Sequence, residues 1–356
     1  ETKDLSLKKT KKFKILKTIA AGDDPKIDNY EKNSVVEIMT GGLVPEPFDS
    51  IIPVEQVKYF PSKKKTTHII VDQEIKKSSY IRFSGEDYNL KDIVVKSGEL
   101  IQPKHIMALT TLGIQEMKVK KKPKMIFYST GNEIVDYTDK NVQSWKVRNS
   151  NNHYFISFGK NLHFQIINGG VIKDDEPNKL KKALNKSLSS DIDIFVTSGA
   201  ISAGKFDFIP KLIEELGFKT HFKGVAIKPG RPIMLSKFKQ KEKLFFGLPG
   251  NPISCAAGFR FFIYPLIRKS LGMPKEKKFK AKLINKYSKK KNFTHFARCS
   301  MNINDQGLAE LEVLQGQQSN RIKSFVKANC WGIFAEGKKE FKPGDFVEWM
   351  PLIPSS

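Results

Sequence analysis

The chain has 356 residues, of which 62 are lysine or arginine and 37 are aspartate or glutamate, giving a formal net charge of +25 at pH 7. Its hydrophobic content is 39%, and it lacks an apolar run of about 18 residues, so we expect no membrane partner. Cys255, Cys299 and Cys330 are too few and too scattered for a disulfide framework or a Cys-x-x-Cys metal site. A reducing, cytoplasmic location fits this cysteine content best.

The positive charge raises the question of nucleic acid, because lysine and arginine neutralise phosphates in such complexes. The lysine clusters, however, are spread from end to end and fall where linkers and turns are expected, at residues 63–65, 120–122, 181–182, 277–278 and 289–291. We interpret them as solvated loops and expect no nucleic-acid partner. The first residues lack an initiating Met and the apolar core of a signal peptide, so we expect the sequence to begin inside a longer protein.

Short apolar stretches broken by Gly and Pro predict a β-rich N-terminal domain over residues 1–85. The predicted strands are residues 35–39, 51–57, 67–71 and 79–83, and a Gly- and Pro-rich loop follows the first of them at residues 40–47. Residues 86–122 are a predicted linker of α+β character. In this linker Glu86 and Asp87 form a turn, and Pro103 starts a helix that runs to about Leu112.

A composition shift at residues 120–123 marks the start of a predicted α/β domain over residues 123–273. The predicted elements are strand 125–128, helix 151–161, strand 164–171, helix 177–187, strand 192–196 and a helix after Asp207. Such alternation predicts a parallel sheet with helices on both faces, in which ligands bind at the carboxyl ends of the strands. The loops at residues 129–133 and 197–204 both fall at that edge.

The loop at residues 197–204 is built from small and hydroxyl-bearing residues, which let backbone N–H groups approach a ligand. The helix that follows presents its positive end to an anion such as phosphate. Asp193 and Asp207 would repel a phosphate unless a divalent cation or a donor group of the ligand lies between them. Alternatively, Asp207 caps its helix and Asp193 lies at a solvated strand end. This segment alone leaves both interpretations open.

Two further loops are predicted at the same edge of the sheet. Lys228 and Arg231 lie in a Gly- and Pro-rich turn that suits an oxyanion. After a strand at residues 244–246, Asn251 is a natural N-cap and Pro252 a natural first residue for an apolar helix that runs to about Leu271. Each loop also has a purely structural interpretation, as a solvated basic turn or a tight turn. Their convergence on one edge favours a binding site.

Beyond residue 272 the sequence predicts strands without helices, and therefore a small all-β domain over residues 274–356. The predicted strands are residues 279–285, 293–302, 308–314, 329–335 and 346–350.

Taken together and in order, these loops resemble the MoeA-type molybdopterin molybdenumtransferases, the family related to the catalytic domain of gephyrin. The resemblance is carried by residues 38–46 (IMTGGLVPE), 85–87 (GED), 129–133 (STGNE), 149–151 (NSN), 197–207 (TSGAISAGKFD), 225–232 (VAIKPGRP) and 247–252 (GLPGNP). It implies an α/β multidomain fold: a MogA-like three-layer α/β domain with a parallel-rich sheet, an elongated β-rich N-terminal region and a small C-terminal β-barrel-like domain.

The resemblance also implies an activity. Members of this family insert molybdate-derived molybdenum into adenylylated molybdopterin and release AMP, in molybdenum cofactor biosynthesis, with Mg²⁺ or Zn²⁺ as the cation. We accordingly expect a cytoplasmic homodimer. Transient contacts with a MogA-type adenylyltransferase and with molybdoenzyme maturation proteins are expected as well.

The residues that match the family's motifs are expected to take over its roles. Catalytic roles are implied for Asp193, Asp207, Glu133 and Lys228, and for Thr40 and Asp87 contributed by the other subunit. The three acidic residues Asp193, Asp207 and Glu133 are also the implied metal ligands. The implied contacts to the pterin and its phosphates come from Thr130, Gly131, Ser198, Gly199, Ser202, Gly204, Pro229, Gly230, Arg231, Pro249, Gly250, Asn251, Pro252 and Ser254.

The sequence departs from the family's pattern at three places. It does not contain the N-terminal Met-Asp-Gly-Tyr segment, Ala200 replaces the second glycine of a usual pair, and Gly224 stands where a lysine is usual. These departures leave open a pterin-binding scaffold with impaired catalysis. A second alternative is a MogA-like molybdopterin adenylyltransferase, which shares only the α/β portion and is disfavoured by the additional β domains.

Overall fold

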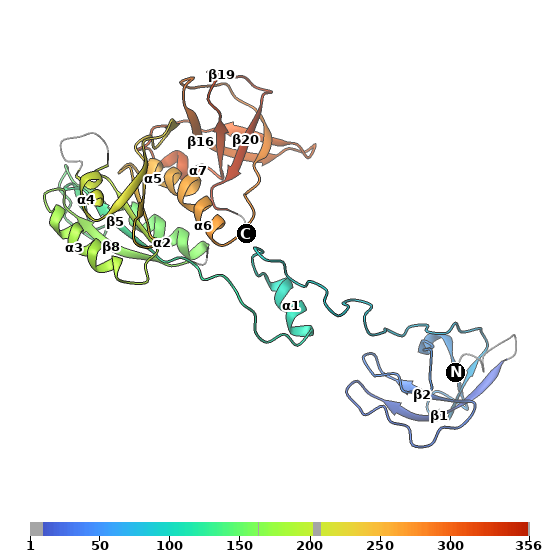
Figure 1. The fold of residues 1–356 in the computed structure, drawn as a ribbon. Coiled ribbons are helices and arrows are strands. Elements are labelled where there is room, and N and C mark those ends of the chain that lie inside the picture. The colour runs from blue at the N-terminus through green and yellow to red at the C-terminus, as the bar shows by residue number, and fades with distance from the viewer. Residues whose placement is uncertain (1–9, 163, 202–207, 355–356) are drawn as a thin grey trace. The chain divides into compact units, whose positions relative to one another are not determined.

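The structure is a computed structural model and describes residues 10–162, 164–201 and 208–354 (Figure 1). The chain divides into two compact units, unit 1 with residues 1–93 and unit 2 with residues 94–356. None of the helices in the described ranges is long and apolar enough to cross a membrane.

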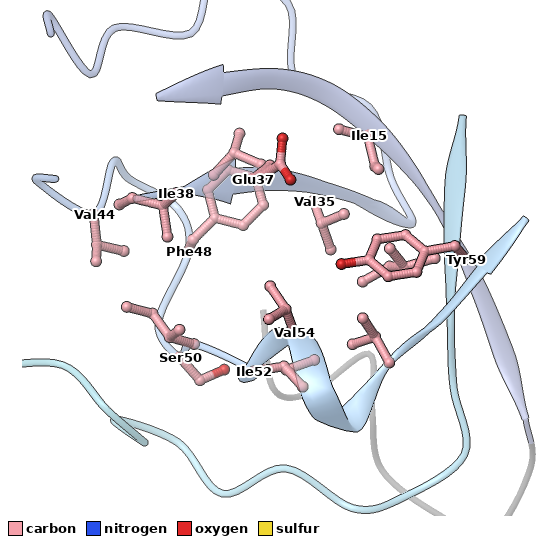
Figure 2. A pocket seen from close by; sticks show the side chains of 14 residues that line it. Ile15, Val35, Glu37, Ile38, Val44, Phe48, Ser50, Ile52, Val54 and Tyr59 are labelled. Atoms are coloured by element: carbon pink, nitrogen blue, oxygen red, sulfur yellow. The ribbon is translucent and has the colours of Figure 1, made fainter. Parts of the chain in front are cut away.

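Unit 1 contains a four-stranded sheet in the order β2-β1-β4-β3. Its elements are β1 (Lys11–Ile19), β2 (Ser34–Ile38), the 3-10 helix η2 (Val54–Gln56), β3 (Lys58–Phe60) and β4 (His68–Val71). Strand β1 pairs in parallel with β2 and antiparallel with β4, and β4 also pairs antiparallel with β3. The buried core is small, with Phe13, Ile19 and Val71 as its most buried apolar residues. Partly buried side chains, among them Val35 and Tyr59, line an apolar hollow of about 120 Å³ in this unit (Figure 2).

Two strands predicted for this region are wrong. Residues 51–57 contain η2 instead of a strand, because Pro53 has no N–H to donate and takes the N-cap position of η2. Residues 79–83 contain the end of a turn and no strand, because Ser78 and Tyr80 have φ values of 66° and 57° and such left-handed backbone cannot continue a strand. The two segments are still joined, since the Ile51 N–H donates to the Ser79 carbonyl over 2.9 Å.

Unit 2 begins with turns and the helix α1 (Pro103–Thr111), which starts at Pro103 as predicted. It continues into a six-stranded sheet in the order β10-β12-β13-β9-β5-β8. The strands are β5 (Met125–Thr130), β8 (Ile166–Ile172), β9 (Ile194–Ser198), β10 (Phe218–Lys223), β12 (Met234–Phe238) and β13 (Leu244–Leu248). Strands β8, β5, β9 and β13 are parallel to one another, whereas β12 pairs antiparallel with β13 and with β10.

Helices cover both faces of this sheet (Figure 1). They are α2 (Asn151–Asn161), α3 (Pro177–Leu188), α4 (Ile209–Glu215), α5 (Pro252–Gly258) and α6 (Tyr264–Ser270). Alternate residues of β9 face opposite layers, since Ile194 and Val196 pack with α2, α5 and α6 while Phe195 packs with α3 and α4. Two separate buried clusters follow from this alternation, and the predicted three-layer α/β domain with a parallel-rich sheet is confirmed.

The predicted apolar helix from Pro252 onward is present but is interrupted by a π-helical segment. Helices α5 and α6 are joined by the π-helical segment η3 (Phe259–Ile263). Pro265 lies in the first turn of α6 and has no N–H to donate to a preceding carbonyl, which explains a local change of hydrogen-bond register there.

The C-terminal region is a closed barrel. Its strands are β14 (Phe279–Leu283), β16 (Thr294–Ile303), β17 (Ala309–Val313), β18 (Cys330–Phe334) and β20 (Phe346–Pro351), and the pairing β16-β17-β14-β20-β18 returns to β16. The remaining elements are β6 (Ile134–Val135), β7 (Val147–Arg148), β11 (Ile227–Lys228), β15 (Tyr287–Ser288), β19 (Glu340–Phe341) and α7 (Lys323–Lys327). The barrel packs on the helix layer, where Phe296 stacks on Phe261 at 3.7 Å between ring centroids.

Candidate functional site

Three strand ends are tied together at the carboxyl edge of the α/β sheet. The Thr130 hydroxyl at the end of β5 donates to the carbonyl of Ser198 at the end of β9, over 3.0 Å. The Gly199 N–H donates to the Leu248 carbonyl at the end of β13, over 2.8 Å. Thr130 and Ser198 are buried. The structure thus brings the loops after β5, β9 and β13 together, as the sequence predicts for a parallel sheet.

Gly199 allows the closest approach between two of these loops. Its φ is +101°, and a Cβ atom there would lie 2.6 Å from the Thr130 hydroxyl oxygen and 2.7 Å from the Thr130 carbonyl oxygen. The next residue, Ala200, has a φ of 49°, in the left-handed region that glycine adopts more readily than alanine. The position where the family usually has a second glycine therefore has a backbone that suits glycine.

The loop after β5 carries Glu133. A Cβ at Gly131 would lie 2.5 Å from a carboxylate oxygen of Glu133, so the carboxylate lies directly over the glycine backbone. The Gly131 N–H donates to the carbonyl of Ile172 at the end of β8, over 3.1 Å. Glu133 is exposed, so its charge is available at this edge of the sheet.

The loop after β8 joins the same edge and brings a carboxylate that the sequence analysis missed. The Asp174 N–H donates to the Asn132 side-chain oxygen over 2.9 Å, and the Lys173 ammonium donates to the Ile134 carbonyl. Asp174 and Asp175 therefore belong to the loop that adjoins Glu133. The signal was present in the sequence, since two acidic residues directly follow a strand of the parallel sheet.

Lys228 and Arg231 lie in a turn that packs on the beginning of α5. A Cβ at Gly230 would lie 3.2 Å from the Ser254 carbonyl oxygen, which places the buried Gly230 backbone against the first turn of this helix. Strand β11 pairs in parallel with β16, and Lys228 is the register partner of His295. The barrel thereby fixes the backbone of Lys228, while the side chains of Lys228 and Arg231 are exposed.

The pKa of His295 is lowered partly by positive charge near this turn. Burial, followed by the charges of Lys228, Lys289 and Arg298, lowers the pKa of His295 to about 3. Its Nδ1 lies within hydrogen-bond distance of the Tyr287 hydroxyl. The histidine is therefore neutral at physiological pH, and the cations that face an anion at this turn are Lys228 and Arg231.

The loop at residues 249–252 connects this turn to the sheet edge. Asn251 occupies the N-cap position and Pro252 the first turn of α5, as predicted. A Cβ at Gly250 would lie 3.9 Å from the Gly199 Cα, and the Asn151 amide donates to the Gly250 carbonyl over 2.8 Å. The first N–H groups of a helix have no partner within the helix. Here the Ile253 N–H, in the first turn of α5, donates to the Ser319 carbonyl over 3.2 Å.

Asp193 lies at the other edge of the sheet, which corrects its expected place beside Glu133. It precedes β9, and its carboxylate accepts the Lys124 N–H over 2.9 Å. The five residues of β9 separate it from the carboxyl edge by roughly 16 Å, at about 3.3 Å per residue. Burial lowers the pKa of the neighbouring Lys243, and the Asp193 charge acts in the opposite direction. The alternative interpretation, a carboxylate at a strand end, fits this position.

The remaining predicted metal and loop residues have no described position. Asp207, Ser202 and Gly204 lie outside the residues that the structure describes. Within the described ranges, no three His, Cys, Asp or Glu side chains form a group that could hold a metal ion. Glu133 is the only one of the three predicted metal ligands with a described position at the carboxyl edge.

Thr40 and Asp87 belong to unit 1. Thr40 lines a cavity of about 950 Å³ together with Gly41, Gly42 and Arg82. The Arg82 guanidinium lies 3.5 Å from the Asp87 carboxylate, and both side chains are largely exposed. Arg82 thus connects the Asp87 carboxylate to the lining of the cavity that contains Thr40.

Three family models match the chain in order. They are the MoeA N-terminal region (domains I and II) at residues 5–113, the probable molybdopterin-binding domain at residues 126–269 and the MoeA C-terminal region (domain IV) at residues 280–352. A solved structure of a molybdopterin biosynthesis MoeA protein from Pyrococcus horikoshii is similar, with a TM-score of 0.77 and 28% identity, over 96% of this chain and 81% of that one.

Curated relatives agree with these models. The molybdopterin molybdenumtransferase of Haemophilus influenzae is 31% identical over 332 residues, 92% of this chain and 80% of the relative. The molybdopterin molybdenumtransferase of Staphylococcus aureus strain Mu50 is 29% identical over 343 residues, 94% of this chain and 78% of the relative. The chain therefore belongs to the MoeA-type molybdopterin molybdenumtransferase family.

Proposed function

We propose that this protein inserts molybdenum from molybdate into adenylylated molybdopterin and releases AMP, as a transferase of molybdenum cofactor biosynthesis. The observation that carries the proposal is the convergence at one sheet edge of the Thr130, Gly199 and Gly250 loops with the basic turn of Lys228. Family matches on both sides of the α/β domain favour this function over that of a MogA-like adenylyltransferase, which would need only the α/β part.

The loops suit a ligand that carries phosphates. Gly131, Gly199 and Gly230 let the backbone of these loops pack closely against neighbouring groups at this edge, and they are among the positions that we propose contact the pterin and its pyrophosphate. Lys228 and Arg231 supply two exposed cations beside Ser254. Molybdate and phosphate are both tetrahedral oxyanions, so this turn can hold either.

The same cations suit the bond-breaking step. An oxygen of water or molybdate attacks one phosphorus of the pyrophosphate, and the bridging oxygen leaves with the other phosphate and takes up negative charge, which frees AMP. Fixed positive charges beside those oxygens stabilise the transition state more than the ground state, typically by about 3–4 kcal/mol for one well-placed donor. Lys228, whose backbone is paired with the barrel, is the residue we assign to this role.

A divalent cation would be held from the opposite side of the site. Mg²⁺ commonly binds one or two carboxylates together with substrate phosphates, so a complete protein cage is not required. Glu133 and Asp174 lie on adjoining loops and provide carboxylates of this kind. When bound, the cation would neutralise and polarise the pyrophosphate. Asp193 is not part of this proposal, and Asp207 stays a prediction.

We further propose that the active unit is a homodimer, with Thr40 and Asp87 contributed by the second subunit. Mixing two inactive variants, Thr40→Ala and Lys228→Ala, under conditions that exchange subunits tests this arrangement. Each mixed dimer would contain one intact site, so random exchange restores about a quarter of the wild-type activity. Activity that stays at the level of the separate variants would contradict it.

The central experiment measures AMP release from adenylylated molybdopterin with Mg²⁺, with and without molybdate. Molybdate-dependent release together with formation of a molybdenum-bearing cofactor supports the proposed transfer. Tight binding of the adenylylated pterin without any release would instead identify a pterin-binding scaffold, the alternative that Ala200 and Gly224 leave open. AMP release that does not respond to molybdate would contradict molybdenum insertion.

A further inference from the structure

Arg298 on β16 is a fully buried cation. It is 0% exposed, and the hydrogen bonds of its side chain in the described part of the chain go to uncharged oxygens. Burial lowers the pKa of its guanidinium to about 10, so the group stays charged at physiological pH. Burying a charge without an opposite charge is unfavourable, and an apolar side chain would fill the same volume without that cost. The feature that only arginine supplies here is a rigid fork of hydrogen-bond donors.

These hydrogen bonds converge on residues 314–322, the loop between β17 and α7, which we call the barrel loop. The Arg298 Nη2 donates to the carbonyls of Gly316 and Gln318. The Arg298 Nε donates over 2.9 Å to the hydroxyl of Ser324 in α7, and this hydroxyl donates to the Gly316 carbonyl over 2.9 Å. The Arg298 N–H donates to the Gln317 side-chain oxygen over 3.0 Å. Arg298 therefore fixes the barrel loop through both its side chain and its backbone.

The same strand also holds the turn at residues 228–231, which we call the basic turn. Lys228 is the register partner of His295, near the beginning of β16. The ring of Phe293, just before β16, has its centroid 6.0 Å from the guanidinium carbon of Arg231, within the range of a cation–π contact. The barrel therefore contacts both cations of the proposed oxyanion site, Lys228 through its backbone and Arg231 through its side chain.

The barrel loop is connected to the basic turn through α5. The Ile253 N–H donates to the carbonyl of Ser319, which directly follows one of the two residues whose carbonyls accept from Arg298. The carbonyl oxygen of Ser254, the next residue of α5, would lie 3.2 Å from a Cβ at Gly230, so the helix and the basic turn are in close contact. Contacts thus lead from Arg298 through the barrel loop and α5 to the basic turn.

We propose that Arg298 is a positioning residue for molybdate binding, an inference that rests on the proposed function. Arg298 holds the barrel loop against α5, so the basic turn is held by both β16 and α5, and its two cations keep fixed positions. Fixed charges bind an oxyanion more tightly than mobile ones, because less conformational entropy is lost on binding. The barrel is thus part of the molybdate site and not only a covering of the α/β domain.

Two substitutions weaken this attachment. Ser324→Ala removes the hydroxyl that accepts from Arg298 and donates to Gly316. Arg298→Lys keeps the positive charge but replaces the planar fork with a single ammonium group. Each variant should raise the molybdate concentration for half-maximal AMP release by about tenfold. The half-saturating concentration of adenylylated molybdopterin should change by less than about twofold, because we place most of its contacts on the loops after β5 and β9.

The matched control is Asn304→Ala, just after the other end of β16. The Asn304 side-chain oxygen accepts the N–H groups of Gln306 and Leu308, so this variant also loses side-chain hydrogen bonds within the barrel. It leaves the barrel loop unchanged, and both half-saturating concentrations should match those of the wild type. Circular dichroism confirms that each variant is folded, and Ser324→Ala decides the outcome if Arg298→Lys does not fold.

Hydrogen exchange tests the attachment without any substrate. The Ile253 N–H should exchange about tenfold faster in Ser324→Ala and Arg298→Lys than in the wild type, because its acceptor, the Ser319 carbonyl, is held less firmly. Mass spectrometry of peptides that cover residues 245–258 follows this exchange, and Asn304→Ala should behave like the wild type. A loss of stability alone would raise exchange throughout the protein, whereas a positioning role raises it at the start of α5.

The inference is overturned if the folded variants Ser324→Ala and Arg298→Lys keep the wild-type half-saturating concentration of molybdate. An equal increase in Asn304→Ala also contradicts it, since any weakening of the barrel would then have the same effect. Unchanged exchange at Ile253 would exclude the route through the barrel loop. The wild type alone tests the proposed function, which is contradicted if its AMP release does not respond to molybdate, so the two failures are distinguishable.

Discussion

Replacing Gly199 with alanine should be among the most damaging single-methyl changes in this protein. The new Cβ would lie 2.6 Å from the Thr130 hydroxyl oxygen and 2.7 Å from its carbonyl oxygen. Neither neighbour can retreat easily, because Thr130 ends a strand that is paired on both sides, with β8 and with β9. The loop after β9 must therefore move away from the loop after β5.

The cost has two parts that a matched variant can separate. A left-handed backbone disfavours alanine by about 1–2 kcal/mol, and overpacking adds about 1–3 kcal/mol, so Gly199→Ala should lose about 2–5 kcal/mol of unfolding free energy. Gly170 on β8 also has a left-handed φ, +85°, but a Cβ there would meet nothing within 4 Å. Gly170→Ala should therefore show the backbone part alone.

Urea unfolding followed by tryptophan fluorescence measures this difference. All three tryptophans, Trp145, Trp331 and Trp349, belong to unit 2, so the signal reports on the unit that contains the substitution. We also expect AMP release to fall far more in Gly199→Ala than in Gly170→Ala, because the first variant displaces a loop of the proposed site. Equal loss of stability in the two variants would refute the close contact between Gly199 and Thr130.

Three further predictions follow from the same geometry. Ala200→Gly should raise the unfolding free energy by about 1 kcal/mol through relief of its φ of 49°, measured by the same urea titration; a loss of stability would show that the Ala200 methyl packs favourably. Lys228→Ala should lower the rate constant of AMP release by about a hundredfold or more. The control Lys219→Ala, on the exposed edge strand β10, should not change this rate constant. Similar rates in both variants would contradict the role of Lys228. The His295 pKa of about 3 lies below its ordinary 6.5, so the unfolded chain binds a proton at this residue more readily than the folded protein does. The free energy of unfolding should therefore decline by up to about 1.4 kcal/mol per pH unit as the pH falls from 6.5 towards 3. A His295→Leu variant with the same pH dependence of stability as the wild type would contradict this.

Local patterns predicted the α/β unit well, because its elements carry strong signals of their own. The helix at residues 151–161 is α2 with the same bounds, and the helix predicted at 177–187 is α3, which ends one residue later. Both have helical apolar spacing, and α3 begins with proline. The wrong strands in unit 1 have apolar and β-branched residues as well, but their backbone is set by Pro53 and by left-handed turns whose side chains give no strong local signal.

The site was harder to predict because the end of a strand at which a residue lies depends on exact strand bounds. The strand predicted at residues 192–196 is observed as Ile194–Ser198, a shift of two residues. That shift places Asp193 before the strand, at the amino edge. Asp174 was not among the predicted site residues, although it lies just after Ile172, the last residue of β8. Which carboxylates share a site thus depends on where each strand begins and ends, and local sequence determines these bounds only to within a few residues.

Asp193 and Glu133 lie at opposite edges of the sheet, so we expect opposite results when each is replaced by its amide. Asp193→Asn keeps an oxygen that can accept the Lys124 N–H, so we expect stability within about 1 kcal/mol of the wild type and AMP release within about twofold. Glu133→Gln removes a negative charge from the loop over Gly131, so we expect the Mg²⁺ concentration for half-maximal activity to rise about tenfold or more. Titrating Mg²⁺ against both variants at saturating substrate decides between them. If Asp193→Asn raises the Mg²⁺ requirement and Glu133→Gln does not, the cation is bound by the residue that lies outside the carboxyl edge, and the proposed position of the site is wrong.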